Sequence, residues 1–245
     1  MKIIVTRPSP DGQAFAQSIC DAQAEVILSP VMAIRPRNFK PDLSGIGALA
    51  FTSVNGVRTF AAMSSDRDFP VFAVGAATGA LCEKAGFTKI ATAQGDIESL
   101  TRLIAQSKPS TPVLHLAGSE RIGDLVINLK PFGVSARLAV IYDAVEIEDL
   151  EPAAADALAQ SSQNCAVVFF SPRSARLFAR QSAKAGLAER LYDAVALAMS
   201  TQIADAAREA CWGRIEIAED LSVEAMAALA RREAAARKSR EGGSR

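Results

Sequence analysis

The sequence predicts an α/β protein built from open parallel sheets with helices on both faces. Short apolar runs rich in β-forming residues alternate with helix-period patterns along the chain, and only a few residues connect them. A strand–turn–helix pattern also occurs twice, as LAFTSVNGVRTFA at Leu49–Ala61 and as VVFFSPRSARLFA at Val167–Ala179. In each copy the apolar run stops at a serine, Ser53 or Ser171, which can cap the helix that follows.

Further matches indicate that a whole domain is duplicated. Val71–Ile90 resembles Val195–Ile215 in the order of its strands, its helix and its aromatic residue. The chain then crosses between the copies twice, near Ala33–Pro36 and near Ile141–Val145. These matches predict two flavodoxin/Rossmann-like parallel-sheet domains on a flexible two-stranded hinge, the first domain being discontinuous in sequence; one continuous sheet is the alternative. The expected parts are residues 1–34 and 146–234 for domain 1, 37–141 for domain 2 and 235–245 for a polar tail.

In the first half of the chain, proline and glycine mark the ends of the elements. Pro36 and Pro41 discourage helix before them, so the segment at Val31–Pro36 is expected to be extended. Gly86 is placed to end the preceding helix as a C-cap. The other expected strands are Lys2–Val5, Val26–Leu28, Ala48–Thr52, Val71–Val74 and Lys89–Thr92, and the expected helices are Asp11–Ala22, Val57–Met63, Thr78–Ala85 and Ile97–Ala105.

In the second half, serine and proline mark the helix starts. Ser171 suits an N-cap and Pro172 the first helical position, and Ser222 can cap the last helix. The polar, glycine-containing end Ala234–Arg245 is expected to fray or be disordered. The expected strands are Val113–Ala117, Ser135–Val145, Ala166–Phe170, Val195–Ala198 and Arg214–Ile217, and the expected helices are residues 122–130, Pro152–Ala159, Ser174–Gln181, Ile203–Ala210 and Ser222–Ala230.

Charge balance and hydropathy exclude several classes of protein. The 245 residues include 27 Lys and Arg against 27 Asp and Glu, so no global charge attracts nucleic acid or an anionic membrane. No run approaches the roughly 18 apolar residues that span a bilayer, and the start MKIIVTRP lacks the features of a signal peptide. We expect a cytoplasmic protein with no nucleic-acid or membrane partner, and a monomer because no apolar helix is left over.

Cysteine and histidine indicate no metal site. The cysteines Cys20, Cys82, Cys165 and Cys211 are widely spaced, and all but Cys165 lie in helical patterns. They are expected to be buried small hydrophobic residues in a reducing compartment. The single histidine, His115, lies in an apolar run and is expected to be a strand side chain rather than a catalyst.

Small or hydroxylated residues, with arginines among them, follow several of the expected strands. In open α/β sheets, ligands bind beyond the carboxyl ends of the strands, and helix N-termini there offer amides and a favourable dipole to anions. The sequence therefore predicts a cleft that binds a polyanion; the alternative is that each Ser or Thr only caps its helix. The segments are Thr6-Arg7, Ser53-Val54-Asn55, Gly75–Thr78, Gly118–Arg121, Ser171-Pro172-Arg173 and Ser200-Thr201.

Motifs of the common cofactor and catalytic classes are missing from the sequence. The chain has neither G-x-G-x-x-G nor a P-loop, so a dinucleotide or a nucleoside triphosphate has no support. It also lacks a G-x-S-x-G elbow and any Ser-His-Asp set. No cofactor is expected, and the predicted cleft has almost no acid–base apparatus.

Seven short motifs occur in a characteristic order between residue 1 and about residue 230. They are TRP at Thr6–Pro8, FTSVNGV at Phe51–Val57, VGAATG at Val74–Gly79, the strand end at Gly118, VIYDAV at Val140–Val145, FFSPRSA at Phe169–Ala175 and AMSTQIA at Ala198–Ala204. Together they resemble the uroporphyrinogen-III synthase family. The chain departs from the family at Met199, where the family often has glycine.

The resemblance implies two α/β domains on a two-stranded hinge and a cofactor-independent lyase of porphyrin and haem biosynthesis. Members of the family cyclise hydroxymethylbilane, a linear tetrapyrrole with eight carboxylates, to uroporphyrinogen III. Water is lost and ring D is inverted in this reaction. Catalysis that relies on holding the substrate in one conformation agrees with the missing acid–base motifs. The implied partners are this small molecule and the upstream bilane-forming enzyme.

The resemblance also assigns roles to particular residues. Tyr142 matches the family's tyrosine at the second crossing and is the candidate general acid, since an unperturbed pKa of about 10 keeps it protonated at neutral pH; the alternative is an aromatic that only packs at the hinge. For the whole chain, the alternative is a non-catalytic two-domain cytosolic module that senses a small anionic ligand. The residues expected to bind substrate are Thr6, Arg7, Ser53, Asn55, Gly118, Ser171, Arg173, Ser200 and Thr201, and no metal is expected.

Overall fold

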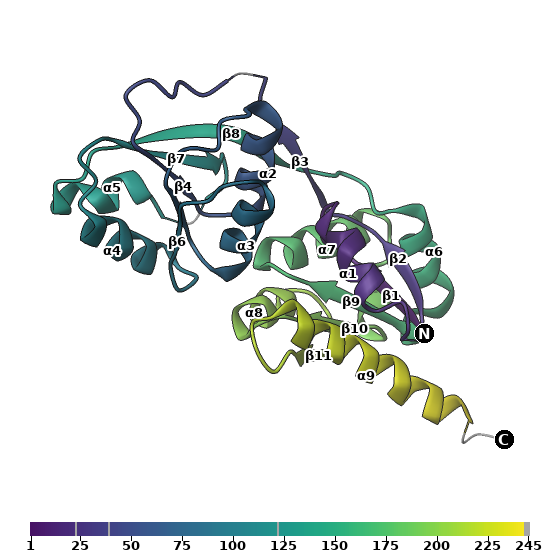
Figure 1. Ribbon diagram of the computed structural model, residues 1–245. Coiled ribbons are helices and arrows are strands. Elements are labelled where there is room, and N and C mark those ends of the chain that lie inside the picture. Colours follow the sequence, from purple (N-terminus) through teal and green to yellow (C-terminus); the bar gives the residue numbers. More distant parts are fainter. Residues whose placement is uncertain (23, 39, 122, 243–245) are drawn as a thin grey trace. The chain divides into compact units, whose positions relative to one another are not determined.

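The computed structural model of the chain describes residues 1–22, 24–38, 40–121 and 123–242, with side chains as far as residue 237 (Figure 1). The chain divides into two compact units. Unit 1 is Met1–Ala33 with Val145–Arg245, and unit 2 is Ile34–Ala144. The described strands form two separate sheets, so the alternative of one continuous sheet is wrong. Over the same residues, no helix is both long enough and apolar enough to cross a membrane.

Unit 1 contains a five-stranded parallel sheet. Its strands are β1 (Lys2–Val5), β2 (Glu25–Leu28), β9 (Cys165–Phe169), β10 (Val195–Ala198) and β11 (Arg214–Ile217). They lie in the order β11-β10-β9-β1-β2 and pair in parallel throughout. Counted along the chain within the unit, this is the flavodoxin-like order 2-1-3-4-5. All residues of β9 and β10 are buried, as expected of central strands that are covered on both faces.

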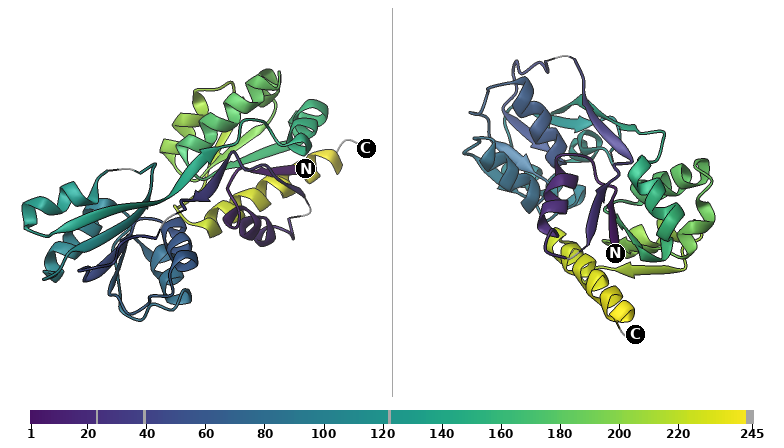
Figure 2. Two further views of the ribbon diagram at one scale, coloured as in Figure 1. Left: turned by 90° about the horizontal axis from the view of Figure 1, so that it is seen from above. Right: turned by 90° about the vertical axis from the view of Figure 1, so that its right-hand side faces the viewer.

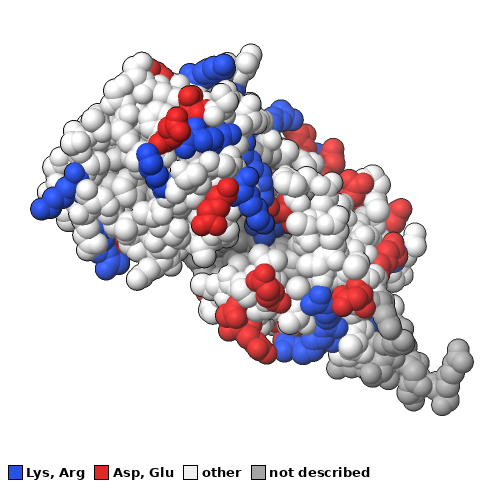
Figure 3. Space-filling view, viewed as in Figure 1, with Lys and Arg blue, Asp and Glu red and all other residues white. Residues whose placement is uncertain are grey.

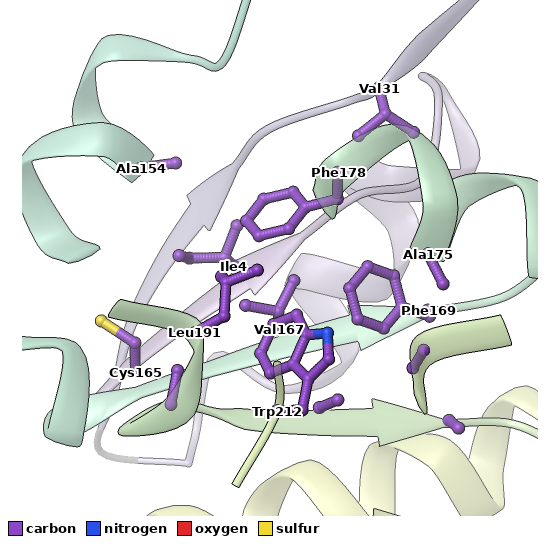
Figure 4. Packing of buried hydrophobic residues seen from close by; sticks show 14 of the residues in the cluster. Ile4, Val31, Ala154, Cys165, Val167, Phe169, Ala175, Phe178, Leu191 and Trp212 are labelled. Atoms are coloured by element: carbon purple, nitrogen blue, oxygen red, sulfur yellow. The ribbon is translucent and has the colours of Figure 1, made fainter. Parts of the chain in front are cut away.

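Helices cover both faces of this sheet. They are α1 (Asp11–Ser18), α6 (Pro152–Ser161), α7 (Pro172–Lys184), α8 (Thr201–Arg208) and α9 (Val223–Gly242), with short 3-10 helices at Ser162–Asn164 and Ala188–Tyr192. One core packs α6, α7 and α8 on the sheet, and in it the Phe169 ring lies 5.8 Å from Phe178 and 5.7 Å from Trp212 (Figure 4). The other core holds α1 and α9, which lie side by side on the opposite face (Figure 2).

Unit 2 contains a six-stranded sheet. Its strands are β3 (Met32–Pro36), β4 (Ala48–Phe51), β5 (Val71–Ala73), β6 (Ile90–Thr92), β7 (Val113–Gly118) and β8 (Ala136–Glu146). They lie in the order β3-β8-β7-β4-β5-β6, and the pairs from β8 to β6 are parallel. The order β8-β7-β4-β5-β6 corresponds to the order β2-β1-β9-β10-β11 of unit 1, so that β7 is equivalent to β1 and β4 is equivalent to β9. Each of the two pairs of repeated sequence segments therefore lies on equivalent strands of the two sheets.

The helices of unit 2 also lie on both faces of its sheet. They are α2 (Val54–Met63), α3 (Ala76–Lys84), α4 (Ile97–Ser107) and α5 (Leu125–Leu129), which runs into a 3-10 turn at Lys130–Phe132. One core packs α2 and α3 around Phe51, Phe60 and Phe87. The other packs α4 and α5 against Ala48 and Ala50. The predicted fold class, α/β with parallel sheets covered on both faces, is confirmed.

Two helices are shorter than the sequence predicts. The helix expected at Asp11–Ala22 ends at Ser18, because the fully buried Ile19 leaves the helical path at φ −116° and ψ 14°. The helix expected at residues 122–130 begins only at Leu125, since Asp124 caps it by accepting the Val126 and Ile127 amides. Residue 122 lies outside the described part.

The last helix is longer than expected. The predicted fraying of Ala234–Arg245 is wrong as far as Gly242, because α9 continues through this segment. Its alanines, arginines and glutamates have high helix propensity, which outweighs the polar composition. Within the segment, the Arg237 guanidinium donates to the Asn164 side chain at 2.8 Å and ties α9 to the rest of unit 1. Residues 243–245 of the predicted tail lie outside the described part.

Two of the four cysteines differ from the prediction. Cys82 and Cys165 are buried, as expected, but Cys20 and Cys211 are exposed. Because α1 and α8 end before these two residues, Cys20 lies in a turn and Cys211 in an irregular segment rather than on buried helix faces. On the face shown in Figure 3, basic and acidic side chains are interspersed, in agreement with the balanced composition.

Candidate functional site

Several predicted residues of unit 1 lie at the carboxyl edge of its sheet. Thr6 follows β1, Ser171 lies two residues beyond β9, and Ser200 lies two residues beyond β10. These three strands are neighbours. Between β1 and β9 the order of the strands changes direction, and ligands of open α/β sheets bind at such a point.

The serines of this edge are N-caps, which was predicted for Ser171 and was the alternative reading for Ser200. Ser171 Oγ accepts the Ser174 amide at 3.1 Å in a capping box, with Pro172 as the first helical residue. Ser200 Oγ accepts the Ile203 amide at 3.3 Å. Thr201, the first residue of α8, is exposed and is not needed as the cap.

Thr6 and its neighbour Arg7 have different surroundings. Thr6 is fully buried, and its hydroxyl donates to the Val168 carbonyl at 2.7 Å, which ties β1 to β9 at this edge. The half-buried Arg7 guanidinium lies 3.4 Å from the Asp11 carboxylate and 4.8 Å from the centre of the Phe170 ring. Arg7 therefore places a positive charge at this edge, whereas the Thr6 hydroxyl is used within the sheet.

In unit 2, Tyr142 and Ser53 meet at the equivalent edge. Ser53 follows β4, Gly118 ends β7 and Tyr142 lies in β8, and these three strands are neighbours. The Tyr142 hydroxyl lies 2.8 Å from Ser53 Oγ, which also accepts the Gly56 amide at 3.1 Å as the N-cap of α2. The prediction that Ser53 caps the helix that follows it is confirmed. Asn55, in the first turn of α2, accepts a bond from Arg58 at 3.3 Å.

Gly118 is the residue that leaves room for the tyrosine ring. A Cβ atom at this position would lie 2.6 Å from Tyr142 Cε2. A β-bulge shifts the register here, so that Ala117 pairs with Val140 but Gly118 pairs with Tyr142. The bulge and the glycine together determine where the tyrosine hydroxyl lies.

The environment of Tyr142 keeps its phenol protonated. The residue is only 6% exposed, and this burial raises the pKa of the phenol above its usual value of 10.0. The bonds to Ser53 and to the Gly118 backbone offset part of the effect. At neutral pH the hydroxyl therefore carries a proton that it can donate to a leaving group.

An ion pair next to the tyrosine was not predicted from the sequence. The Arg37 guanidinium binds both oxygens of the Asp143 carboxylate, at 2.8 and 2.9 Å, and with the Ser119 hydroxyl it lowers the pKa of that carboxyl to about 2. These partners are 106 residues apart in the chain, so no local pattern could have linked them. In the described part of the chain, no group of His, Cys, Asp and Glu side chains could hold a metal ion.

The single histidine is a buried strand residue, as predicted. His115 is 1% exposed, and its Nε2 lies 3.0 Å from the Thr52 hydroxyl. Burial and the nearby Arg121 charge lower the pKa of the imidazole from 6.5 to about 4, so the ring is neutral at physiological pH. No described group partners its buried Nδ1.

The chain is similar to known proteins over almost its whole length. A family model described as uroporphyrinogen-III synthase HemD matches residues 13–228. The crystal structure of uroporphyrinogen-III synthetase from Helicobacter pylori 26695 superposes with a TM-score of 0.67 at 20% identity, covering 94% of this chain and 97% of that one.

A second solved structure has the same fold. A mutant uroporphyrinogen III synthase from the extremely thermophilic bacterium Thermus thermophilus gives a TM-score of 0.55 at 18% identity and covers 97% of this chain and 99% of that one. A comparison with curated protein sequences gave no match. At these identities the structures support the fold, and the family match is the finding that bears on function.

Protonation of His115 makes the stability of the protein depend on pH. Because the pKa in the folded state is lower than in the unfolded state, the stabilisation is complete above about pH 6.5 and is lost as the pH falls towards 4. Between pH 7 and about pH 4.5, wild type is expected to lose roughly 2–3 kcal/mol more unfolding free energy than His115→Gln does. Urea unfolding of both proteins at these pH values measures the difference. Equal losses in the two proteins would contradict the shifted pKa.

Proposed function

This chain belongs to the uroporphyrinogen-III synthase family, and we propose that it cyclises hydroxymethylbilane to uroporphyrinogen III with loss of water and inversion of ring D. The observation that carries the proposal is the buried, protonated Tyr142 phenol, held 2.8 Å from Ser53 at the carboxyl edge of the unit 2 sheet. This edge is where ligands of such sheets bind. No observation favours a non-catalytic module that senses anions.

Tyr142 acts as the general acid in the proposed reaction. It donates its proton to the terminal hydroxyl of the substrate, which leaves as water and generates an azafulvene cation. The substituted carbon of ring D attacks this cation, and the spiro intermediate fragments and recloses with ring D inverted. The final loss of a proton from the macrocycle returns a proton to the phenolate. Unassisted closure gives the uninverted isomer, so the protein contributes mainly by orienting the chain of pyrroles.

The carboxyl edges of both sheets supply the binding groups for the substrate carboxylates. Capped helix N-termini offer amides and a positive dipole end, and Arg7 adds a charge in unit 1. We assign substrate carboxylates to groups at the carboxyl edge of each sheet, and we assign the hinge to β3 and β8. Thr6, predicted to bind substrate, is fully buried and donates to the Val168 carbonyl, so it supports this edge from within the sheet instead. The assigned residues are Arg7, Ser53, Asn55, Gly118, Ser171, Arg173, Ser200 and Thr201.

We also propose where and with which partners the protein works. The protein works in the cytoplasm as a monomer and needs no cofactor for this chemistry. Its small-molecule partner is hydroxymethylbilane, which the upstream bilane-forming enzyme supplies. Incubation with hydroxymethylbilane, oxidation and separation of the porphyrin isomers tests the function. Type III porphyrin above the spontaneous type I background supports the activity, and type I alone contradicts it.

Tyr142→Phe is expected to lower kcat by between about 5-fold and about 100-fold without abolishing turnover, because one proton donor is lost while the orienting contacts remain. The measurement is the steady-state rate of type III formation. Tyr192→Phe is the matched control, since Tyr192 is 68% exposed and precedes β10, at the amino end of that strand. Unchanged kinetics of Tyr142→Phe would leave this residue a packing role only.

Loss of single carboxylate contacts is expected to raise KM by about 2- to 10-fold with little change in kcat, because many contacts share the binding of one substrate. Arg7→Gln and Thr201→Val test this expectation in unit 1. Arg208→Gln, which alters an exposed arginine at the other end of α8, is the control. A rise in KM of several thousand-fold in either Arg7→Gln or Thr201→Val would show that binding is concentrated in one contact rather than distributed over many.

A further inference from the structure

His115 is bonded to Thr52, which lies one residue beyond the paired part of β4. In the sheet of unit 2 it lies opposite Ala50 of β4. Thr52 lies two residues beyond Ala50, so its side chain points to the same face of the sheet as His115. The hydrogen-bonded ladder of β4 ends one residue earlier, at Phe51, which pairs with Leu116 and Ala73. The 3.0 Å contact between His115 Nε2 and Thr52 Oγ1 therefore extends the attachment of this chain segment beyond the ladder.

The segment that is attached in this way carries the partner of the tyrosine. Ser53 follows Thr52 directly and adopts an extended conformation at φ −159° and ψ 155°. Its side chain therefore points to the opposite face, where Tyr142 belongs to the core around Phe51. Ser53 Oγ meets the Tyr142 hydroxyl there at 2.8 Å. The position of Thr52 thus helps to set the position of the hydroxyl that holds the catalytic proton donor.

We propose that His115 is a positioning residue, which fixes Thr52 and through it the Ser53 hydroxyl that orients Tyr142. The inference rests on the proposed function, because it assigns His115 a role in that same site. His115 itself is not a catalytic residue. It is 1% exposed and lies on the face of the sheet that packs against α4 and α5, away from the tyrosine.

The cost of burying this imidazole supports a specific role. Its Nδ1 has no partner among the described groups, and an unpartnered buried polar atom destabilises the folded state. An apolar side chain would avoid this cost in the apolar run Val113–Ala117. What an apolar residue could not supply is the bond to Thr52.

A double-mutant cycle between Thr52 and Tyr142 tests the inference in the full-length protein. Thr52→Val removes the hydroxyl at nearly constant volume and is expected to lower kcat by about 3- to 30-fold, with KM within about twofold of wild type. In the Tyr142→Phe background the same change is expected to have no further effect, because the hydroxyl to be oriented is gone. Thr52→Ser keeps the hydroxyl and is expected to restore most of the rate.

Substitutions at His115 give a second measurement. His115→Leu is expected to lower kcat by the same factor as Thr52→Val, and His115→Gln, whose amide nitrogen can lie near the position of Nε2, is expected to recover most of it. Thr88→Val, at an exposed threonine, is the control. Urea unfolding of each variant shows whether it is folded. If His115→Leu is unfolded, the double-mutant cycle with Thr52→Val still tests the inference.

The outcomes separate this inference from the proposed function. The positioning role is overturned if Thr52→Val has the kcat of wild type, or if it lowers kcat by the same factor with and without Tyr142→Phe, while wild type still makes the type III isomer. A wild type that makes only the type I isomer overturns the proposed function, and the inference with it. Non-additive losses of kcat with rescue by Thr52→Ser support the inference.

Discussion

The close packing of the Tyr142 ring against Gly118 is the constraint on which the site in unit 2 depends. Gly118 has no side chain, so the ring occupies the space where a Cβ would lie, 2.6 Å from Cε2. The bulge between Ala117 and Gly118 brings the tyrosine opposite the glycine, and the hydroxyl then reaches Ser53 Oγ. Burial of the ring raises the pKa of the phenol, so packing and chemistry have the same cause.

Within the described residues, the two units of the duplicated architecture differ at this point. Ser53 and Ser171 cap equivalent helices at equivalent points of the two sheets. In unit 1 the third helical residue is Ser174, whose hydroxyl lies 3.1 Å from Ser171 Oγ. In unit 2 the corresponding residue is Gly56, which has no side chain to compete for Ser53 Oγ. Ser171 thus caps α7 in unit 1, whereas Ser53 in unit 2 both caps α2 and contacts the Tyr142 hydroxyl.

The sequence was sufficient for those features that depend on local patterns. Alternating strands and helices, the serine caps and the internal repeats are encoded within short windows, and the structure contains all of them. The contact between Ser53 and Tyr142 joins residues that are 89 positions apart in the chain. The hydroxyl of the buried Thr6 donates to the carbonyl of Val168, which is 162 residues away. Such contacts arise only when the sheets form, so they could not be derived from local patterns. The full length of α9 is hard to predict because the polar composition of its last turns resembles that of a solvated tail.

Substitution of Gly118 by alanine tests the central claim most directly. The added Cβ forces the Tyr142 ring, and with it the hydroxyl, away from Ser53, whereas the backbone of Gly118 needs no left-handed conformation and tolerates the change. We predict a folded protein whose kcat for type III formation falls by at least about tenfold, while KM changes by less than about threefold. A folded Gly118→Ala protein with the kcat of wild type would contradict the claim.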